Sequence, residues 1–278
     1  MTQLKESGIE ILDAYEASRL GLWEELQSFA QCDPARHYFI LLGLLNPEKT
    51  FRSIITARDE QGNLLAAFMQ RSSGNAQLMM SQELVNPSLP REVLLPFSEA
   101  IRQIGFNQLI AAMSYCEVIA AFDLFVSHTV GAEIAVMPAE ISGSKALEDE
   151  IIYDLEPLKT TDLDEITALY QRCFHAFTPK PIMEEKLNTG RGHGVVVREN
   201  GQIVACAQSE FESPNHALIV GVATSPEFRG RGMASSCVAG LVKQLAEPGR
   251  DFALQYDNPR AGRIYKRLGF VPIDYVGH

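Results

Sequence analysis

The second half of the chain shows the clearest pattern of apolar and polar positions. Residues 151–155 are mostly apolar and predict a short strand. The polar cluster at residues 160–162 is typical of a helix start, and apolar residues then recur at helical spacing from Leu163 to Phe174. Residues 181–188 predict a second, short helix. The pattern therefore begins with one strand and two helices.

A hairpin signal follows these helices. Residues 195–198 and 203–207 are apolar runs, and Asn200-Gly201 lies between them. Asn-Gly supplies the positive φ angles that a two-residue hairpin turn needs. Residues 217–224 predict another buried strand, so this region contributes a run of antiparallel strands.

The last part of the chain alternates helices and strands. A glycine-punctuated loop leads into a helix over residues 233–246 and a strand over residues 252–256. A helix over residues 259–268 begins with a proline and stops at a glycine, and residues 271–276 predict a final strand. Antiparallel strands followed by this alternation predict an α+β (α/β-like) fold, with a mixed, mostly antiparallel sheet flanked by helices.

The first half of the chain resembles a diverged copy of this arrangement of helices and strands. Residues 60–66 align with residues 199–205 at an offset of 139, and the same offset places Asn86-Pro87 on Ser225-Pro226. The elements predicted beyond it, in the order of the second half, are a helix over residues 93–104, a strand over residues 108–113 and a helix over residues 118–128. This shared order favours a duplication.

The repeat predicts two tandem domains, residues 1–145 and 146–278. The length of 278 residues suits two domains of roughly 100–200 residues each, and one large domain also fits it. The first copy has no glycine in residues 88–92, where the second has its glycine-rich loop. We therefore expect that the first copy lacks whatever function the loop performs.

The composition is that of a soluble globular protein, with 46% hydrophobic and 21% charged residues. No apolar run approaches the ~20 residues that cross a bilayer. The first ten residues do not resemble a signal peptide. The five cysteines lie far apart, without metal-ligand spacing. These features predict a cytoplasmic protein with reduced core thiols, no membrane partner and no metal site.

The net charge of −11 argues against binding to nucleic acid, which requires a basic surface. Residues 226–267 depart from this balance, with eight basic and four acidic residues. A locally basic segment in an acidic protein favours a small polyanionic ligand over a polymer. Solvated helix faces would produce the same local charge.

The glycine-punctuated loop contains the sharpest chemical pattern, Arg229-Gly230-Arg231-Gly232, between a strand and a helix. Glycines allow close approach of the backbone to a ligand, and the amides at the next helix start form an anion site. The two arginines add charge-assisted contacts that suit a diphosphate. A tight turn with incidental arginines is the alternative. The loop is neither a Walker loop nor a dinucleotide fingerprint.

Two motifs carry a family resemblance. Arg229, Gly232 and Ala234 match R-x-x-G-x-A, which resembles the acyl-CoA loop of the GNAT N-acetyltransferase superfamily. Residues 257–270 are similar to its N-x-x-A-x-x-x-Y-x-x-x-G-F signature. The amino-acid sequences of both segments most resemble those of the glycine N-acyltransferase-like branch. The good match covers residues 195–270, about a quarter of the chain, and a weak match extends over the second half.

The resemblance implies two tandem GNAT-like domains: a degenerate first copy without a cofactor loop and a catalytic second copy. It also implies acetyl-CoA as co-substrate. Backbone groups of Val222, Ala223 and Thr224 would bind the pantetheine arm and polarise the thioester carbonyl, and Asn258 would also hydrogen-bond the arm. The residues expected at the diphosphate are Arg229, Gly230, Arg231, Gly232, Met233, Ala234 and Ser235.

The resemblance also implies that Tyr265 donates a proton to the departing CoA thiolate. Packing beneath Phe270 is the alternative role for this aromatic ring. The general base is less visible. Glu210, Glu212 and His216 flank the turn before residues 217–224, and we take Glu212 as the candidate, although each also fits a solvated turn.

One departure concerns the edge of the sheet. The family sheet usually continues for two strands after its Gly-Phe pair, whereas this sequence has one strand after Phe270. An uncovered edge is a pairing liability. We therefore expect residues 133–141 of the first half, or a second subunit, to cover it.

These motifs predict an acyl-CoA-dependent N-acyltransferase that transfers an acetyl group to a small-molecule amine by direct attack. A non-catalytic acyl-CoA-binding sensor or scaffold is the alternative, and a structural tandem domain with incidental glycines is a third. The chain would act as a monomer or homodimer. Its acidic balance favours cationic amines.

Overall fold

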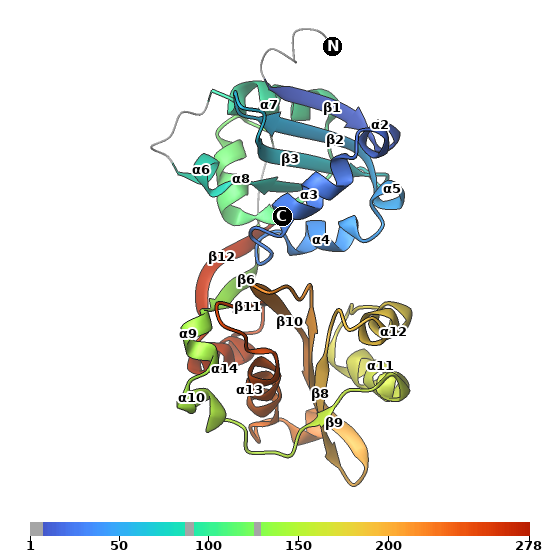
Figure 1. Ribbon diagram of the computed structural model, residues 1–278, viewed down its shortest axis with the longest axis vertical. Helices are drawn as coiled ribbons and strands as arrows, with labels where there is room; N and C mark the ends of the chain where they lie inside the picture. Colours follow the sequence, from blue (N-terminus) through green and yellow to red (C-terminus); the bar gives the residue numbers. More distant parts are fainter. Residues whose placement is uncertain (1–7, 87–91, 125–128) are drawn as a thin grey trace. The chain divides into compact units, whose positions relative to one another are not determined.

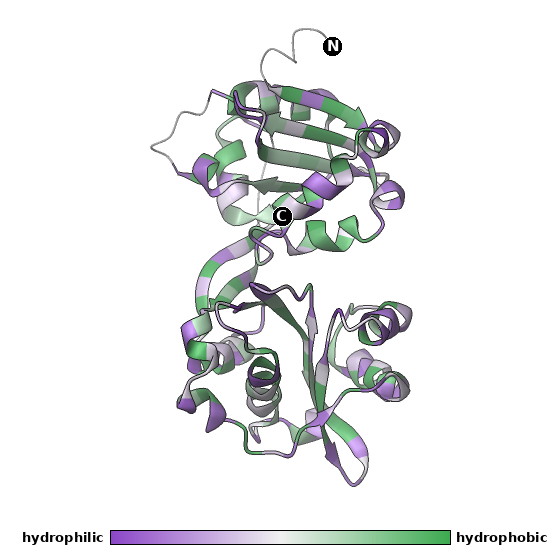
Figure 2. Cartoon of the chain, viewed as in Figure 1, coloured by the Kyte–Doolittle hydropathy of each residue, from purple (hydrophilic) through white to green (hydrophobic). Residues whose placement is uncertain are grey.

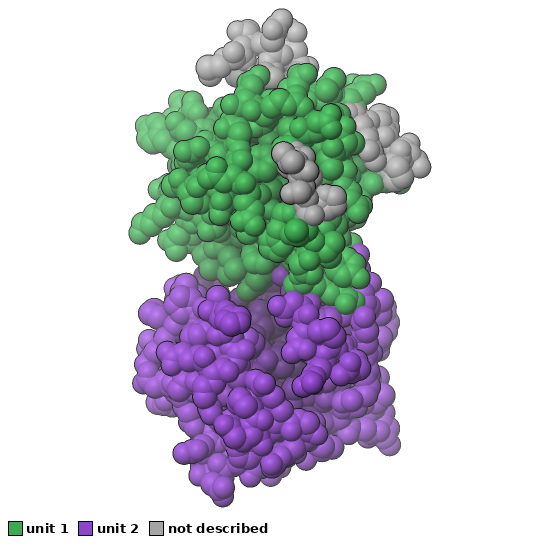
Figure 3. All heavy atoms as spheres, turned by 180° about the vertical axis from the view of Figure 1, so that it is seen from behind, with its two compact units in different colours: residues 1–133, 274–278 green, residues 134–273 purple. Residues whose placement is uncertain are grey.

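The computed structural model describes residues 8–86, 92–124 and 129–278, which form two compact units (Figure 3). Unit 1 contains the residues up to 133 together with residues 274–278, and unit 2 contains residues 134–273. Each unit has its own strands and helices (Figure 1).

The units divide differently from the predicted domains 1–145 and 146–278. The chain changes units within strand β6 (Val130–Met137) and again within strand β12 (Val271–Gly277). The first half of the sequence thus supplies a strand to unit 2, and the end of the sequence returns to unit 1. Neither exchange leaves a signal in the local pattern of residues.

Unit 1 contains a sheet and short helices. Its elements before β6 are β1 (Ile9–Asp13), α2 (Ala14–Arg19), α3 (Leu22–Ala30), α4 (Tyr38–Leu44), α5 (Pro47–Thr50), β2 (Phe51–Arg58), β3 (Leu64–Arg71), β4 (Ala76–Met80), α6 (Gln82–Val85), α7 (Leu94–Ile104), β5 (Leu109–Ala112) and α8 (Met113–Ala120). All five residues of β4 are buried, and α4 is apolar along almost its whole length (Figure 2).

The strands of unit 1 follow the order β1-β2-β3-β4-β5. The first four are antiparallel, whereas β4 and β5 are parallel. The helix and strand predicted over residues 93–104 and 108–113 are confirmed as α7 and β5. The helix predicted over residues 118–128 begins earlier, as α8, because it follows β5 without a connecting loop. Residues 125–128 and Pro87 of the repeat lie outside the described residues.

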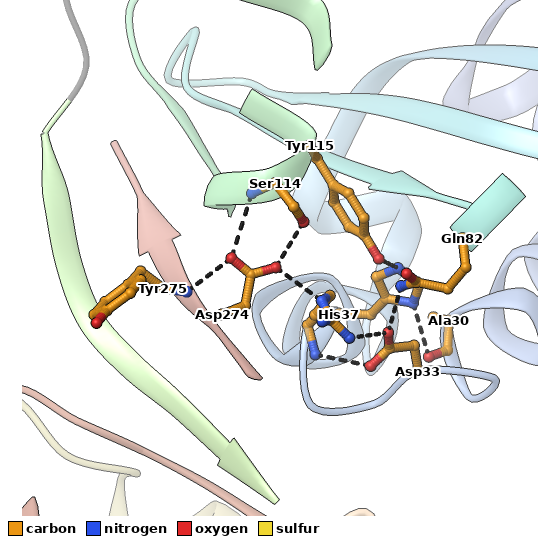
Figure 4. Close-up of polar contacts among 9 residues, drawn as sticks. Ala30, Asp33, His37, Gln82, Ser114, Tyr115, Asp274 and Tyr275 are labelled. Atoms are coloured by element: carbon orange, nitrogen blue, oxygen red, sulfur yellow. Dashed lines mark hydrogen bonds and ion pairs between the residues drawn. The ribbon is translucent and has the colours of Figure 1, made fainter. Parts of the chain in front are cut away.

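A polar cluster ties the end of the chain into unit 1 (Figure 4). The Asp274 carboxylate accepts a hydrogen bond from Arg36 Nε at 2.8 Å and another from Ser114 Oγ at 2.6 Å. Beyond this cluster, Val276 pairs with Ala112 in an antiparallel ladder. The last five residues are therefore a structural part of unit 1.

His37 lies at the buried side of the same cluster and is 2% exposed. Its Nδ1 lies 3.1 Å from the Ala30 carbonyl oxygen, and its Nε2 lies 3.0 Å from the Tyr115 hydroxyl (Figure 4). Burial lowers the pKa of His37, although the nearby Asp33 carboxylate opposes this shift. His37 is therefore held as a neutral imidazole.

Unit 2 is also built on strands of mixed direction. Beyond β6 its elements are α9 (Ala139–Ser142), α10 (Lys145–Glu148), β7 (Glu156–Pro157), α11 (Leu163–Cys173), α12 (Lys180–Asn188), β8 (Gly194–Glu199), β9 (Gln202–Glu210), β10 (His216–Thr224), α13 (Met233–Leu245), β11 (Asp251–Tyr256), α14 (Pro259–Leu268) and β12. Short 3-10 helices span Thr160–Asp162 and Pro226–Phe228.

The strands of unit 2 follow the order β6-β11-β10-β9-β8-β7. The pairs from β7 to β10 are antiparallel, and β10 and β11 are parallel. Val196 of β8 packs with α11 and α12, whereas its neighbours Val195 and Val197 pack with α13 and α14. Helices therefore cover both faces, and the predicted fold class, a mixed sheet flanked by helices, is confirmed.

Two strand predictions need correction. Residues 151–155 form no strand; Ile151, Tyr153 and Leu155 pack on the core beside α13 instead, and the strand is the two-residue β7. Of residues 133–141, only those up to Met137 are strand, because α9 begins after Pro138. A strand from the first half does join this edge, as predicted, but β6 lies between β11 and β12 and not outside β12.

No helix in the described part of the chain combines the length and apolar character that crossing a membrane requires. The longest of these helices, α13, has 13 residues.

A bulge in β10 shapes the centre of unit 2. Val220 pairs with Gln208 and Ala223 with Cys206, so β10 holds one more residue than β9 between these pairs. Gly221 occupies the bulge with φ of +59°, and its carbonyl accepts a hydrogen bond from the Tyr170 hydroxyl at 2.9 Å. A Cβ at this position would overlap that hydroxyl. Glycine is therefore required here both by φ and by space.

We expect Gly221→Ala to lower the free energy of unfolding by about 2–4 kcal/mol, because it adds a steric overlap to an unfavourable φ. Gly201→Ala is the matched control. Gly201 also has a positive φ, of +80°, but a Cβ there would meet nothing within 4 Å, so we expect a loss of about 1 kcal/mol. Urea unfolding measures both, and equal losses would contradict the steric role of Tyr170.

The buried His37 predicts a pH dependence of stability. Its folded-state pKa lies below the ordinary value of 6.5, so between these two values the unfolded chain binds more protons than the folded one. The folded state is therefore more stable at higher pH. Its stability falls as the pH drops through this window, by up to about 1.4 kcal/mol per pH unit.

Replacing His37 with Gln should remove this part of the slope in unfolding curves measured from pH 7.5 to pH 5. His175→Gln, at an exposed position, is the control and should leave the slope unchanged. Parallel curves for wild type and His37→Gln would show that His37 takes up protons equally in both states.

Candidate functional site

The candidate site lies where two parallel strands stop pairing. The ladder between β10 and β11 joins His216–Leu218 to Asp251–Ala253 and then ends. β10 nevertheless continues to Thr224, past the bulge. The edge of Val222, Ala223 and Thr224 that faces away from β9 is therefore outside the ladder. Such an edge offers main-chain N–H and C=O groups to a ligand.

The glycine loop begins directly after this edge. Gly230 and Gly232 have φ of +79° and +84°, and Gly232 is the N-cap of α13. No side chain among the described residues caps this helix start. The amides of Met233, Ala234 and Ser235 in its first turn form the positive end of the helix dipole. The backbone thus presents free amides at the position where the sequence predicts an anion site.

The loop arginines are exposed, and their guanidinium groups contact neighbouring residues. Arg229 Nε donates to the Thr224 carbonyl at 3.2 Å, and one of its terminal nitrogens lies 3.7 Å from Cys173 Sγ. The Arg231 guanidinium lies over the Phe228 ring, 5.1 Å from its centroid. The Arg231 carbonyl accepts from the Tyr153 hydroxyl at 2.8 Å. A terminal nitrogen of Arg231 also donates to the Glu227 carbonyl at 3.3 Å. Both side chains lie at the surface, where an anion can reach them.

Three of the predicted binding residues have side chains that are buried or already hydrogen-bonded within the protein. The Ser235 hydroxyl accepts from Arg267 at 2.7 Å, so its backbone amide is what it can present to a ligand. Met233 is buried in the core. Asn258 is exposed as the N-cap of α14, and its Oδ1 accepts from the Arg260 amide at 2.9 Å. The Asn258 amide nitrogen is the group that can still donate.

Thr224 presents a buried hydroxyl at the open edge of β10. Its Oγ1 has no hydrogen-bond partner among the described residues. A buried polar atom without a partner is unfavourable and is satisfied when a ligand supplies one. Thr224 thus points to a polar ligand beside the glycine loop.

Tyr265 lies on α14, 7% exposed. Its ring contacts Tyr256 at 5.3 Å and Phe270 at 6.0 Å between centroids, so the packing against Phe270 that was considered as its alternative role is present. Burial, with the nearby Tyr256, raises the pKa of Tyr265 well above its ordinary value. The hydroxyl therefore keeps its proton at neutral pH, as a proton donor must.

Glu212, the candidate base, is held by neighbours. His193 Nδ1 lies 2.9 Å from both carboxylate oxygens, and the Ser209 hydroxyl donates to one of them. Its side chain is 11% exposed, so it is not a solvated turn residue. His216, the other turn candidate, is engaged through its backbone with Ser213. The structure thus brings together Glu212 and His193.

Sequence reasoning missed two buried residues of α11 and α12 that contact β9. Tyr170 is buried and holds the bulge, and Lys186 is buried beside Glu210. Lys186 follows Met183 by three positions, which places a cation on the apolar face of α12. This misplaced charge was the available signal. No group of three or more potential metal ligands occurs within residues 8–86, 92–124 and 129–278.

Comparison with known proteins identifies relatives of this arrangement. Residues 163–270 match the model of the Acetyltransferase (GNAT) family. Over 130 residues the chain is 25% identical to an acetyltransferase from Pectobacterium atrosepticum, a match that covers 44% of this chain and 91% of that protein. Residues 163–270, which the family model matches, contain the bulge, the glycine loop and the α14 motif.

Two solved structures share the fold over 97% of both chains. An acetyltransferase of the GNAT family from Colwellia psychrerythraea superposes with a TM-score of 0.62 at 13% identity. A tandem GNAT protein from the clavulanic acid biosynthesis pathway superposes with a TM-score of 0.60 at 17% identity. At these identities the likeness shows the fold alone. Residues 163–270 therefore resemble a GNAT acetyltransferase domain, and the chain as a whole shares the fold of these two structures.

Proposed function

We propose that this chain is an acyl-CoA-dependent N-acyltransferase that transfers an acetyl group from acetyl-CoA to a small-molecule amine. The glycine loop between β10 and α13 is the observation that carries the proposal. It contains two exposed arginines and leads into a helix start without a side-chain cap. It follows the part of β10 that no longer pairs with β11. This combination suits a diphosphate with an extended arm.

The residues present fit the CoA moiety. Residues 229–235 would hold the diphosphate through main-chain amides and the two guanidinium groups. Val222–Thr224 would hold the pantetheine amides, and the Thr224 hydroxyl would gain its missing partner. Asn258 would donate to the same arm through its side-chain nitrogen. Val222–Thr224 and residues 229–235 follow one another along the chain, and Asn258 lies where β11 gives way to α14.

Acetyl-CoA supplies a thioester whose carbonyl carbon forms the new C–N bond with the amine as the C–S bond breaks. Backbone amides of β10 polarise that carbonyl. Tyr265 gives its proton to the departing sulfur and recovers one from solvent. Glu212 accepts the proton that the amine loses, through water, and His193 keeps the carboxylate in place. The products are an amide and the CoA thiol.

We propose that unit 1 is a degenerate GNAT-like domain that binds no acyl-CoA. Its parallel strands β4 and β5 pair only at Ala76–Leu109 and Gln77–Ile110, which resembles the short ladder of β10 and β11. After β4, however, α6 follows a single residue later, and His37 and Tyr115 are buried near the end of that strand. The glycine loop has no counterpart in residues 81–86.

The finer assignments rest on sequence and composition. The amino-acid sequences of residues 229–235 and 263–270 support membership of the glycine N-acyltransferase-like branch. All five cysteines are free thiols, which is compatible with the cytoplasmic location that we propose.

Acetyl-CoA at a hundredfold excess over its dissociation constant should stabilise the protein by about 2.7 kcal/mol, seen as a higher melting temperature. Replacing Arg229 and Arg231 together with Gln should weaken this binding about tenfold or more. Calorimetric titration should give one acetyl-CoA per chain. Two sites per chain would contradict the degenerate role of unit 1, and the absence of binding would refute the proposed function.

Tyr265→Phe should lower kcat about a hundredfold and leave the dissociation constant of acetyl-CoA within about threefold of the wild-type value, because the lost proton acts only as the C–S bond breaks. Tyr256→Phe removes a hydroxyl from the same aromatic cluster and is the control. The assay is release of CoA thiol with a panel of primary amines.

Equal activity of Tyr265→Phe and wild type would dismiss Tyr265 as the acid. If the wild-type protein binds acetyl-CoA and releases no thiol with any amine, the non-catalytic acyl-CoA sensor becomes the better description.

A further inference from the structure

Two buried polar side chains of β9 lie beside the bulge of β10. Gln208 and Glu210 are two positions apart, so they share one face of the sheet, which α11 and α12 cover. Gln208 is 1% exposed and Glu210 is 5% exposed. Their register partners on β10 are Val220 and Leu218, the last paired residues before Gly221.

Gln208 has an amide oxygen that nothing satisfies. Its Nε2 donates to the Tyr170 hydroxyl at 2.6 Å, and Tyr170 in turn donates to the Gly221 carbonyl. Its Oε1 is buried without a hydrogen-bond partner in the described part of the chain. Because buried acceptors in native proteins almost always have a donor, this oxygen indicates a ligand that brings one.

Glu210 carries a buried charge two residues along the same strand face. Lys186 Nζ lies 3.3 Å from Glu210 Oε1, and Thr178 Oγ1 donates to the same atom at 3.1 Å. The Lys186 side chain is 9% exposed, and burial lowers its pKa although Glu210 opposes the shift. A buried ion pair is a weak source of stability, because desolvation offsets its attraction. This pair therefore calls for a role other than stability.

A carboxylate and an amide oxygen on one strand face both require hydrogen-bond donors. A primary ammonium offers three donors and no acceptor, which matches this pair of groups. A carboxylate or phosphate ligand would be repelled by Glu210 and would leave Gln208 Oε1 unsatisfied. The donor set thus selects a cation.

We propose that Glu210 and Gln208 recognise the amine of the acceptor substrate, whose ammonium donates to the Glu210 carboxylate and to Gln208 Oε1. This inference rests on the proposed function. Lys186 occupies the carboxylate in the absence of substrate, and the substrate ammonium competes with it. Thr178, on the connection between α11 and α12, closes over the carboxylate.

The position suits delivery to the thioester. Val220, the register partner of Gln208, precedes Val222 by two residues, or about 7 Å along a strand. Val222 is the first residue of the edge proposed to hold the thioester end of the arm. Tyr170 links the two directly, because its hydroxyl contacts both Gln208 and the bulge. The recognition site and the cradle therefore share one rigid element.

The test compares Glu210→Gln and Gln208→Leu with wild type, using n-butylamine, benzylamine and 1,5-diaminopentane at saturating acetyl-CoA. For the best of these amines, Glu210→Gln should raise KM about thirtyfold or more, with kcat and acetyl-CoA affinity within about threefold. Gln208→Leu should change KM in the same direction. Glu210→Asp should restore part of the loss.

Two further variants separate recognition from a structural role. Glu185 lies on α12 beside Lys186 and pairs with Arg191, which follows the helix. Glu185→Gln breaks this exposed pair and should leave KM unchanged. Lys186→Met removes the competing cation, so it should lower KM and make the protein more responsive to amine in thermal melts. If Lys186→Met and Glu210→Gln lose stability alike and neither changes KM, the pair is structural and the inference is overturned.

Failure of the proposed function would look different. If wild type releases no thiol with any of the three amines, catalysis fails, but melting curves still decide the inference. A rise in melting temperature with an amine that disappears in Glu210→Gln supports the recognition site. No rise, or a rise that Glu210→Gln retains, refutes it.

Discussion

The hydrogen bond from the Tyr170 hydroxyl to the Gly221 carbonyl organises unit 2. It holds the extra residue of β10 in a conformation that glycine adopts and other residues disfavour. The bulge turns the second half of β10 away from its ladder with β11, and the open edge at Val222–Thr224 follows from that divergence. The same hydroxyl accepts from Gln208, so one buried group couples the bulge of β10 to β9.

The two units show how one topology supports different uses. Both have a pair of parallel strands with a short ladder, β4 with β5 and β10 with β11. In unit 2 the chain continues into a glycine loop and an uncapped helix, which together attract an anion. Near the corresponding strands of unit 1 lies a satisfied polar cluster around Asp274 and His37, which holds the end of the chain (Figure 4).

The buried carboxylates of the two units also differ in how completely their surroundings are hydrogen-bonded. Asp274 in unit 1 is matched by Arg36 and Ser114, and its role is to hold a strand. Glu210 in unit 2 is matched by Lys186, but Gln208, two residues along the same strand face, has an amide oxygen without a donor among the described residues. A closed network stabilises one conformation, whereas an incomplete one leaves a place for a ligand.

Local sequence signals predicted much of the fold and the cofactor side of the site. Asn200-Gly201 indicated its hairpin, because the turn demands residues that accept positive φ. The glycine loop was readable because its glycines and arginines are contiguous. Glu212 was named from its position near a turn, but its contacts with His193 and Ser209 join residues that the sequence separates.

The sequence by itself determined most of the element order in the second half, the hairpin and the glycine loop, since each depends on residues that are neighbours in the chain. Only the tertiary structure decided that β6 enters between β11 and β12, that the last five residues return to unit 1, and that Lys186 meets Glu210. These pairings join segments far apart in sequence. They are set by burial and hydrogen-bond satisfaction across the whole fold, which no local pattern encodes.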